Sequence, residues 1–333
     1  MKKVSLAVLF VMCFLISAVS IKAEELNLLS GWKFSGDATA FASFKAEERT
    51  TDSKLNFSYM QFYAEKQIQR DLTVYLSLAV NNKEYNNDQN NYETTILVDT
   101  AFLSYSLNDV LSVHIGREII NYGYQNPICI IDEKFAMLPS VSLSYFGGYV
   151  LRGDGVGLAV RNSTVDVNLA YMNIPTDNSI NGKSYYARVS KTLGSLTLGV
   201  NGLFAKGPDS AIQSDGVSYF GPDIKYTNDL LDFRTELIFA NRETDFGSGT
   251  ESVNRIGAYS QITVNLLSSK KLYVGSRLDY VEPYTVYDKE INRYISGVVG
   301  SYLYDNVLVR AQFKSNIDEG KDSEAGLMLT VTF

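Results

Sequence analysis

Segments in which apolar and polar residues alternate follow one another along almost the whole of this sequence. In LTVYLSLAV, residues 72–80, the apolar side chains of Leu72, Leu76 and Val80 share one parity, and Thr73 and Ser77 share the other. A period of two predicts a β-strand with one apolar and one polar face. Sixteen such candidate strands begin near residues 31, 54, 72, 95, 111, 150, 165, 184, 196, 218, 230, 255, 272, 292, 307 and 324.

The connections between these candidate strands alternate in length. Those after even-numbered strands are short, such as 69–71 (QRD) and 304–306 (YDN), and those after odd-numbered strands are long and polar, such as NNKEYNNDQNNYETT. This asymmetry predicts an all-β transmembrane antiparallel β-barrel with short periplasmic turns and long extracellular loops. Lipid cannot hydrogen-bond a strand edge, so the sheet must close on itself. A soluble solenoid or sandwich is the alternative, and a count of fourteen or eighteen strands stays open.

The N-terminal residues predict export. Residues 1–23, MKKVSLAVLFVMCFLISAVSIKA, combine a basic start, an apolar run and small residues before a cleavage point after Ala23. This pattern is typical of a secretory signal peptide, whereas a transmembrane anchor needs nearer twenty apolar residues. We therefore expect residues 24–333 to form one barrel domain in the outer membrane of a Gram-negative bacterium.

The last ten residues, EAGLMLTVTF, form an alternating strand that ends on Phe333. Chain ends are usually frayed and polar. As the final strand of a closed barrel, this segment would pair with the first strand near residues 32–44, and Phe333 would lie in the periplasmic aromatic girdle.

Composition narrows the classes of function. The chain has 37 acidic and 30 basic side chains and a formal net charge of −7, which argues against nucleic acid as a partner. Of its two cysteines, only Cys129 lies outside the predicted signal peptide, so we expect no intrachain disulfide.

Charged side chains recur on the parity opposite to the apolar one. In LYVGSRLDY, Arg277 and Asp279 share the parity of Tyr273, and a slip of one residue would turn both charges toward lipid. A charged interior in a barrel this wide implies water, although paired charges or a plug could also fill it. The predicted lumen-facing charged residues are Lys33, Asp37, Arg161, Asp166, Arg188, Arg234, Glu236, Arg277, Asp279, Arg310 and Lys314.

One connection differs from the rest, at about residues 118–150 between the fifth and sixth strands. It contains two apolar stretches, 128–131 and 135–138, which would be an aggregation hazard on the cell surface. Long irregular loops are usually functional. We expect this loop to fold into the lumen and narrow it, with Asp132, Glu133 and Lys134 as constriction charges. Exposure of the loop at the surface is the alternative.

Residues 97–123, LVDTAFLSYSLNDVLSVHIGREIINYG, resemble a hairpin of Gram-negative porins, in which a strand and short turn lead to a Gly-Arg pair and a Tyr-Gly step. The following LRGDGVGLAV, 151–160, looks like the next strand of that pattern. The resemblance is to sixteen-stranded general and phosphate-selective porins. It implies a homotrimer in contact with outer-membrane lipid and lipopolysaccharide, with the loop after the fifth strand as its constriction. Phe333 resembles the C-terminal signal that the barrel-assembly machinery reads. Phosphate-selective porins carry a lysine-rich constriction loop, whereas this loop has only Lys134 beside two acids.

The sequence offers little for catalysis or cofactors. His114 is the only histidine, no serine or cysteine near it has the spacing of a known nucleophile arrangement, and no metal or haem site can be assembled. We expect a passive, non-enzymatic channel for small hydrophilic solutes or ions, without a cofactor. A sheath for a periplasmic cytochrome, and an outer-membrane hydrolase that uses His114, are the alternatives.

Overall fold

The computed structural model describes residues 31–47, 50–84, 92–120, 122–123, 134–135, 139, 152–174, 182–206, 216–245, 250–267, 271–282, 291–318 and 323–333. The predicted signal peptide, Asp132 and Glu133 lie outside these ranges. The strands are β1 (Trp32–Glu47), β2 (Thr50–Gln69), β3 (Leu72–Glu84), β4 (Tyr92–Ser106), β5 (Leu111–Ile119), β6 (Arg152–Arg161), β7 (Val165–Ile174), β8 (Gly182–Leu193), β9 (Leu196–Lys206), β10 (Gly216–Thr227), β11 (Leu231–Asp245), β12 (Thr250–Asn265), β13 (Leu272–Val281), β14 (Asn292–Tyr304), β15 (Val307–Asn316) and β16 (Ser323–Thr332).

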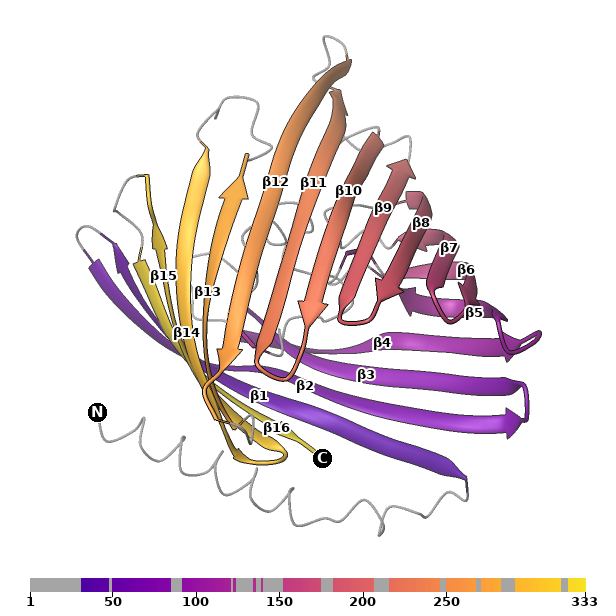
Figure 1. The fold of residues 1–333 in the computed structure, drawn as a ribbon, viewed down its shortest axis with the longest axis horizontal. Coiled ribbons are helices and arrows are strands. Elements are labelled where there is room, and N and C mark those ends of the chain that lie inside the picture. The colour runs from indigo at the N-terminus through magenta and orange to yellow at the C-terminus, as the bar shows by residue number, and fades with distance from the viewer. Residues whose placement is uncertain are drawn as a thin grey trace.

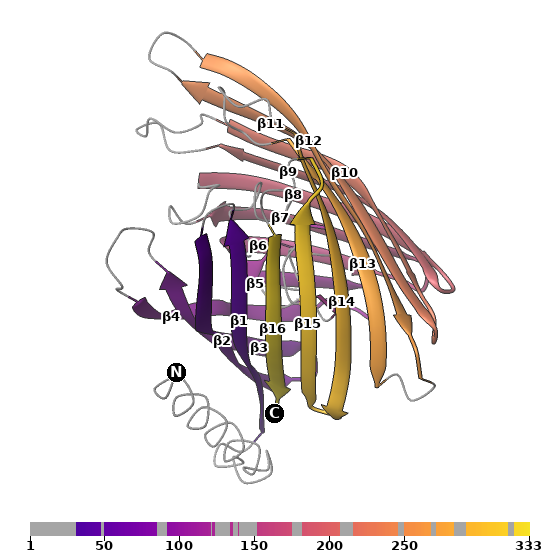
Figure 2. The ribbon, with the colours of Figure 1, turned by 90° about the vertical axis from the view of Figure 1, so that its left-hand side faces the viewer.

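These sixteen strands form one closed antiparallel barrel in which every strand pairs with its neighbours in the sequence (Figure 1). The ring closes where β16 lies between β1 and β15 (Figure 2). Asp37 is opposite Thr332 at one end of this seam, and Ala46 is opposite Ser323 at the other. The predicted fold, strand count and seam are confirmed.

Two strands begin four or five residues earlier than the alternation predicts, β2 at Thr50 and β12 at Thr250. In both, backbone pairing continues past the last apolar residue, to Asp245 opposite Thr250 on β11 and β12. Hydrophobic periodicity marks only the part of a strand with one apolar face, so it misses a polar extension of the hairpin.

Three of the short turns share one side-chain cap. Asn108, Asn162 and Asn228 each accept two hydrogen bonds through Oδ1, from the backbone N–H groups two and three residues further on, at 2.7–2.9 Å. An asparagine side chain that bonds its own following backbone forms an Asx turn, which closes a hairpin locally. The short turns are thus specified by residues next to one another in the sequence.

The two faces of the wall differ in chemistry. On β8, the outward side chains of Tyr185 and Val189 are 57% and 49% exposed, whereas the inward Ser184 and Arg188 are buried. The outward parity of other strands likewise carries exposed apolar side chains, among them Ile115, Phe220 and Phe239. An apolar outer band is what a barrel presents to lipid. Among the described residues, no helix is long and apolar enough to cross a membrane.

One ion pair interrupts the apolar outer band. Arg117 on β5 donates from Nε and Nη2 to the two carboxylate oxygens of Asp154 on β6, at 2.8 and 2.9 Å. The next outward residues on these strands are the exposed Ile115 and Val156. Arg117 also donates to the carbonyl oxygen of Val98 on β4, at 3.4 Å. Protein groups therefore neutralise the guanidinium and accept its hydrogen bonds on a face where lipid tails supply no acceptor.

We expect Asp154→Asn to lower the free energy of unfolding by about 2 kcal/mol, because an unneutralised arginine facing lipid costs about 2–4 kcal/mol. Arg117→Gln combined with Asp154→Asn should restore much of that loss. Urea unfolding of the barrel in lipid vesicles measures both changes. Asp318→Asn, which breaks the solvent-exposed pair with Arg293, is the matched control and should have little effect. Full stability of Asp154→Asn would show that lipid does not surround the pair.

Candidate functional site

The segment after β5 reaches strands on the far side of the ring. Its described residues Tyr122 and Gly123 contact the inner wall on β9, β10 and β11, and Lys134 and Phe135 contact β13 and β15. In the ring order, β13 lies eight strands from β5 in either direction. The described residues of this segment therefore lie against the inner wall opposite β5.

Asn201 on β9 holds the first part of this loop. Its Oδ1 accepts hydrogen bonds from the backbone N–H of Gly123 at 2.9 Å and from Arg188 on β8 at 2.8 Å. Its Nδ2 donates to Asp223 on β10 at 2.5 Å. Arg188 also donates to both carboxylate oxygens of Asp223, at 2.5 and 2.9 Å. We call these four residues, Gly123, Arg188, Asn201 and Asp223, the Asn201 anchor; Asn201 bonds to both members of the Arg188–Asp223 ion pair and to the loop backbone.

Gly123 fits this anchor because it has no side chain. Its φ is +60°, a left-handed conformation that other residues adopt only with strain. A Cβ at this position would also overlap the carboxylate of Glu236 on β11. The backbone conformation therefore favours glycine here, and any side chain would also require the Glu236 carboxylate to move.

A second anchor holds Lys134 and Phe135. The hydroxyl of Tyr273 on β13 donates to the carbonyl oxygen of Lys134 at 2.8 Å, and Arg310 on β15 donates to that of Phe135 at 3.2 Å. The guanidinium of Arg277 lies 4.7 Å from the centre of the Phe135 ring, within the range of a cation–π contact. Phe135, Tyr273, Arg277 and Arg310 are all almost fully buried. We call this group the Phe135 anchor.

Apolar packing supports the start of the loop. Ile120 and Tyr122 belong to a buried cluster with inward side chains of β7 to β13, among them Tyr186, Tyr219 and Tyr259. The rings of Tyr122 and Tyr219 meet edge to face, with centroids 6.2 Å apart. Such a cluster would be out of place on a fully wetted wall, so this part of the inner face is built to receive the loop.

Most of the buried inner charges lie in ion pairs. Arg234 and Asp232 pair along β11 at 2.9 Å, and Arg277 and Asp279 pair along β13 at 3.1 Å. Arg152 pairs with Asp99 of β4. Asp99 also accepts hydrogen bonds from Gln61 of β2 at 2.5 Å and Ser77 of β3 at 3.2 Å. The wall is polar, with acids and bases neutralising one another locally.

The predicted lumen-facing residues fall into three groups. Arg188 belongs to the Asn201 anchor, Arg277 and Arg310 belong to the Phe135 anchor, and Asp279 pairs with Arg277. Five residues lie nearer the rims of the barrel. Lys33 is 3.5 Å from Glu65, and Asp37 accepts a hydrogen bond from Tyr63 at 3.5 Å. Arg161 is opposite Asp166, and the ammonium group of Lys314 is 4.3 Å from the centre of the Tyr294 ring. Arg234 pairs with Asp232, and Glu236 accepts from Tyr259 at 3.3 Å.

Of the predicted constriction charges, the structure describes Lys134. Its ammonium group lies 4.4 Å from the centre of the Tyr273 ring and 5.9 Å from that of Tyr302, against the wall. Sequence reasoning missed Asp99, Asn201, Asp223 and Tyr273 as members of the site. Their partners lie on other strands, so only the barrel register brings them together.

His114 on β5 lies between a carboxylate and a hydroxyl group. Its Nδ1 lies 2.7 Å from Glu118 Oε1, and its Nε2 lies 3.2 Å from Ser112 Oγ. The imidazole stacks on Phe102, with ring centroids 5.6 Å apart. The spacing of Ser112 and His114 matches no known nucleophile motif, but an extended strand places residues 112, 114 and 118 on one face. Within the described ranges, no three His, Cys, Asp or Glu side chains gather closely enough to hold a metal ion.

The barrel is similar to solved outer-membrane proteins. It matches OmpF of Salmonella typhi in complex with daunomycin (19% identity, TM-score 0.66, 91% of this chain and 97% of that one) and an anion-selective porin from Comamonas acidovorans (10%, 0.67, 91% and 99%). It also matches the outer membrane channel DcaP of Acinetobacter baumannii (12%, 0.63, 92% and 98%). No protein-family model and no curated protein sequence matches this chain. These likenesses show a porin-like fold.

Proposed function

We propose that this chain is a passive outer-membrane channel for small hydrophilic solutes or ions, narrowed by the loop after β5. The observation that supports the proposal is the position of Lys134 and Phe135, which follow β5 in the sequence and are bound by Tyr273 and Arg310 on the opposite wall. A closed wide barrel with a polar inner wall provides a water-filled path, and a loop held across it limits the size of the solute.

The pairing of charges on the inner wall affects how strongly the channel would discriminate between anions and cations. Because most of the buried charges neutralise one another in pairs such as Arg188–Asp223 and Arg277–Asp279, we expect weak discrimination by charge along the wall. Asp132 and Glu133, which precede Lys134 in the loop, are then the residues we propose to bias the constriction.

Planar-bilayer recording of the purified barrel tests the proposed function. We expect stepwise conductance and a small reversal potential in a salt gradient, which should shift toward anions in Asp132→Asn combined with Glu133→Gln. A barrel that inserts into the bilayer without carrying ion current would contradict the channel hypothesis. Such a result, with co-purification of a haem protein, would instead support the cytochrome sheath.

A hydrolase is a second candidate because the side chains of Ser112, His114 and Glu118 lie next to one another on β5. Their order of hydroxyl, imidazole and carboxylate matches a nucleophile, a base and a group that orients the base. It ranks second because β5 pairs with both β4 and β6, so its backbone N–H groups serve the sheet and not an oxyanion. Hydrolysis of short-chain esters by the purified barrel, lost in His114→Ala, would favour this function.

The seam suggests how the barrel is assembled. The backbones of Gly36 and Phe333 exchange two hydrogen bonds of 2.8 Å, and the Phe333 ring meets Phe62 at 5.9 Å between centroids. We propose that Phe333 is the signal for the barrel-assembly machinery, that residues 1–23 direct export, and that the barrel forms a homotrimer.

We expect deletion of Phe333 to reduce the amount of barrel assembled in the outer membrane far more than it reduces the urea midpoint of the refolded protein. The reason is that a recognition signal acts before folding is complete, whereas the ring contributes one edge contact to the folded seam. Phe62→Ala removes that same contact and leaves the terminus intact, so it should assemble normally. Equal assembly of both variants would show that Phe333 is purely structural.

A further inference from the structure

β12 extends beyond the end of its neighbour β13 on the side of the long loops. Its ladder with β11 starts at Thr250 opposite Asp245, whereas its ladder with β13 stops at Gly257 opposite Val281. Figure 1 shows the tips of β11 and β12 rising above the tip of β13. Among the described strands, none pairs with residues 250–255 on the β13 side. We call this stretch the β12 edge.

The backbone groups of Ser252 and Asn254 point out of this edge. The carbonyl oxygen of Ile256 accepts a hydrogen bond from the N–H of Glu282, just beyond the end of β13, at 3.1 Å. In an antiparallel sheet the N–H and C=O of one residue point to the same neighbour, and those of the next residue point to the other neighbour. Asn254 and Ser252, two and four residues before Ile256, therefore point the same way, where no described strand meets them.

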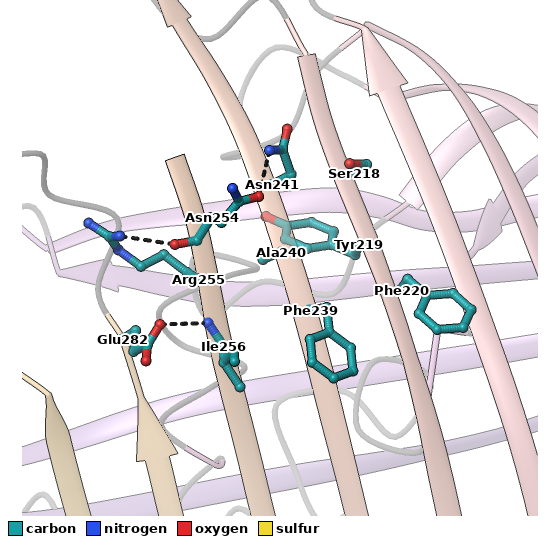
Figure 3. Close-up of a pocket in the computed structure, with 10 residues that line it drawn as sticks. All are labelled: Ser218, Tyr219, Phe220, Phe239, Ala240, Asn241, Asn254, Arg255, Ile256 and Glu282. Carbon is teal, nitrogen blue, oxygen red and sulfur yellow. Dashed lines mark hydrogen bonds between the residues drawn. The ribbon is translucent and has the colours of Figure 1, made fainter. Parts of the chain in front are cut away.

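Two side chains cover the first positions of the β12 edge (Figure 3). Glu282 Oε2 accepts a hydrogen bond from the N–H of Ile256 at 3.0 Å, and Arg255 Nη1 donates to the carbonyl oxygen of Asn254 at 2.9 Å. The hydroxyl of Tyr280 donates to Glu282 Oε1 at 2.8 Å. The carboxylate thus lies where an added strand would place a C=O, and the guanidinium lies where it would place an N–H.

The β12 edge lies beyond the apolar band of the wall. Across β10 to β12, an outward apolar row is followed by an outward polar row nearer the long loops: Phe220, Phe239 and Ile256, then Ser218, Asn241 and Asn254. These rows and Glu282 line a groove with a volume of about 480 Å³ (Figure 3). Lipid cannot satisfy backbone N–H and C=O groups, so an open edge is tolerated only above the apolar row. Water, and a protein dissolved in it, can therefore reach this edge.

The β12 edge is ordered without a neighbour on its open side. Asn241 on β11 donates from Nδ2 to Ser252 Oγ at 2.6 Å and to Asn254 Oδ1 at 2.8 Å, which holds both outward side chains in place. Within the described ranges, the backbone of Ser252 carries no side-chain cap like that of Asn254. A strand that adds here meets a preformed template, and preorganisation lowers the entropic cost of binding.

We propose that the β12 edge binds an extended segment of another protein outside the cell, which adds as a strand antiparallel to β12 and continues the line of β13. In this mode main-chain hydrogen bonds supply affinity, and alternate side chains supply specificity. The added strand would take over the Asn254 carbonyl from Arg255, whose guanidinium then needs a new acceptor. An acidic residue opposite Arg255 supplies one, because opposite charges at facing positions stabilise a sheet. This role goes beyond solute passage and does not depend on it.

The probe is the acetylated hexapeptide Glu-Thr-Val-Thr-Val-Thr with a C-terminal fluorophore, which places glutamate opposite Arg255 and the first threonine opposite Asn254. Fluorescence anisotropy with the detergent-solubilised full-length barrel should show saturable binding. N-methylation of the first threonine removes the N–H that would donate to Asn254 and should weaken binding by about tenfold. N-methylation of the next valine, whose N–H points away from β12, is the matched control and should have little effect.

Ser252→Pro should weaken binding of this peptide by about tenfold, because it removes an N–H from the open edge. That N–H points away from β11, so the variant should fold, as proline is tolerated at a strand edge. Ser252→Ala loses only the hydroxyl contact with Asn241 and should bind as the wild type does. Arg255→Glu should abolish the preference for glutamate and favour a peptide with lysine in its place.

Five results would overturn the proposal. The first is no saturable binding, which is expected if the caps only protect the edge from unwanted pairing. The second and third are equal effects of the two N-methylations, and equal binding by Ser252→Pro and Ser252→Ala. The fourth is binding only after residues 283–290 are replaced by a Gly-Ser linker, which would assign the edge to the chain's own loop. The fifth is a change in the number of copies in Ser252→Pro by native mass spectrometry, which would assign it to a second copy.

Single-channel conductance of the Ser252 variants separates this site from the proposed function, because the N–H that they alter lies at a strand edge beyond the apolar band. Peptide binding by a barrel without conductance would contradict the channel alone. Normal conductance without peptide binding would contradict strand addition alone.

Discussion

Gly123→Val should release the start of the loop after β5 from the inner wall and raise the single-channel conductance. Valine cannot adopt the φ of +60° without strain of about 1–3 kcal/mol, and its Cβ would overlap the carboxylate of Glu236. The hydrogen bond from the Gly123 N–H to Asn201 would then be lost. Because the barrel wall is hydrogen-bonded independently of the loop, the variant should still fold. Planar-bilayer recording and circular dichroism measure the two effects.

Gly194 provides the matched control for this prediction. Its φ is also +60°, but it lies in the turn between β8 and β9, and a Cβ there would meet nothing within 4 Å. Gly194→Val should therefore carry the backbone strain and leave the conductance as in the wild type. If both variants conduct alike, the contact between Gly123 and the wall does not control the open area.

Phe135→Ala should have the largest effect on stability. The side chain is fully buried, and truncation of a buried phenylalanine typically costs about 3–5 kcal/mol. The substitution also removes the ring that faces the Arg277 guanidinium at 4.7 Å. We expect the loop to leave the β13–β15 wall, with a lower urea midpoint and a noisier, larger conductance. Cys129, the only cysteine outside residues 1–23, lies between the two anchors in the sequence. Its labelling by a thiol reagent should become faster.

Phe313→Ala is the control, because Phe313 lies on β15 but faces outward and is half exposed. It should lose less stability and leave both conductance and Cys129 labelling unchanged. Phe135→Leu keeps an apolar side chain of similar reach, so it should separate the loss of packing from the loss of the cation–π contact. Wild-type stability of Phe135→Ala would show that the loop is not held at this anchor.

The barrel was predictable because its signals are local. Alternation along each strand fixes which face is apolar, and turn residues such as Asn108 fix where a hairpin closes. Pairs such as Asp232–Arg234 and Arg277–Asp279 also follow from local sequence, since residues two apart share a face of a strand. The strand order then follows from antiparallel pairing of neighbours.

The anchors of the loop were not predictable, because they depend on the register of strands remote in the sequence. Asn201 meets Gly123 across 78 residues, and Arg310 meets Phe135 across 175. Nothing in the alternation distinguishes Asn201 or Tyr273 from other inward residues of their strands. The apolar stretch that begins at Phe135 predicted that the loop would fold inward, but not the wall that receives it.

The pairing of β1 with β16 also determines which strands can pair last during folding. Every other pairing joins neighbouring hairpin strands, whereas Thr39 and Thr330, whose hydroxyl groups are 3.3 Å apart, are separated by 291 residues. Contacts this distant in sequence carry the largest loop-closure entropy and form slowly. Because β16 is synthesised last, a nascent or truncated chain has two unpaired edges, which cannot persist in lipid. If the barrel is exported as proposed, we expect the joining of β16 to β1 to be the last step of barrel closure, and chains that stall before it to be the main targets of periplasmic proteolysis.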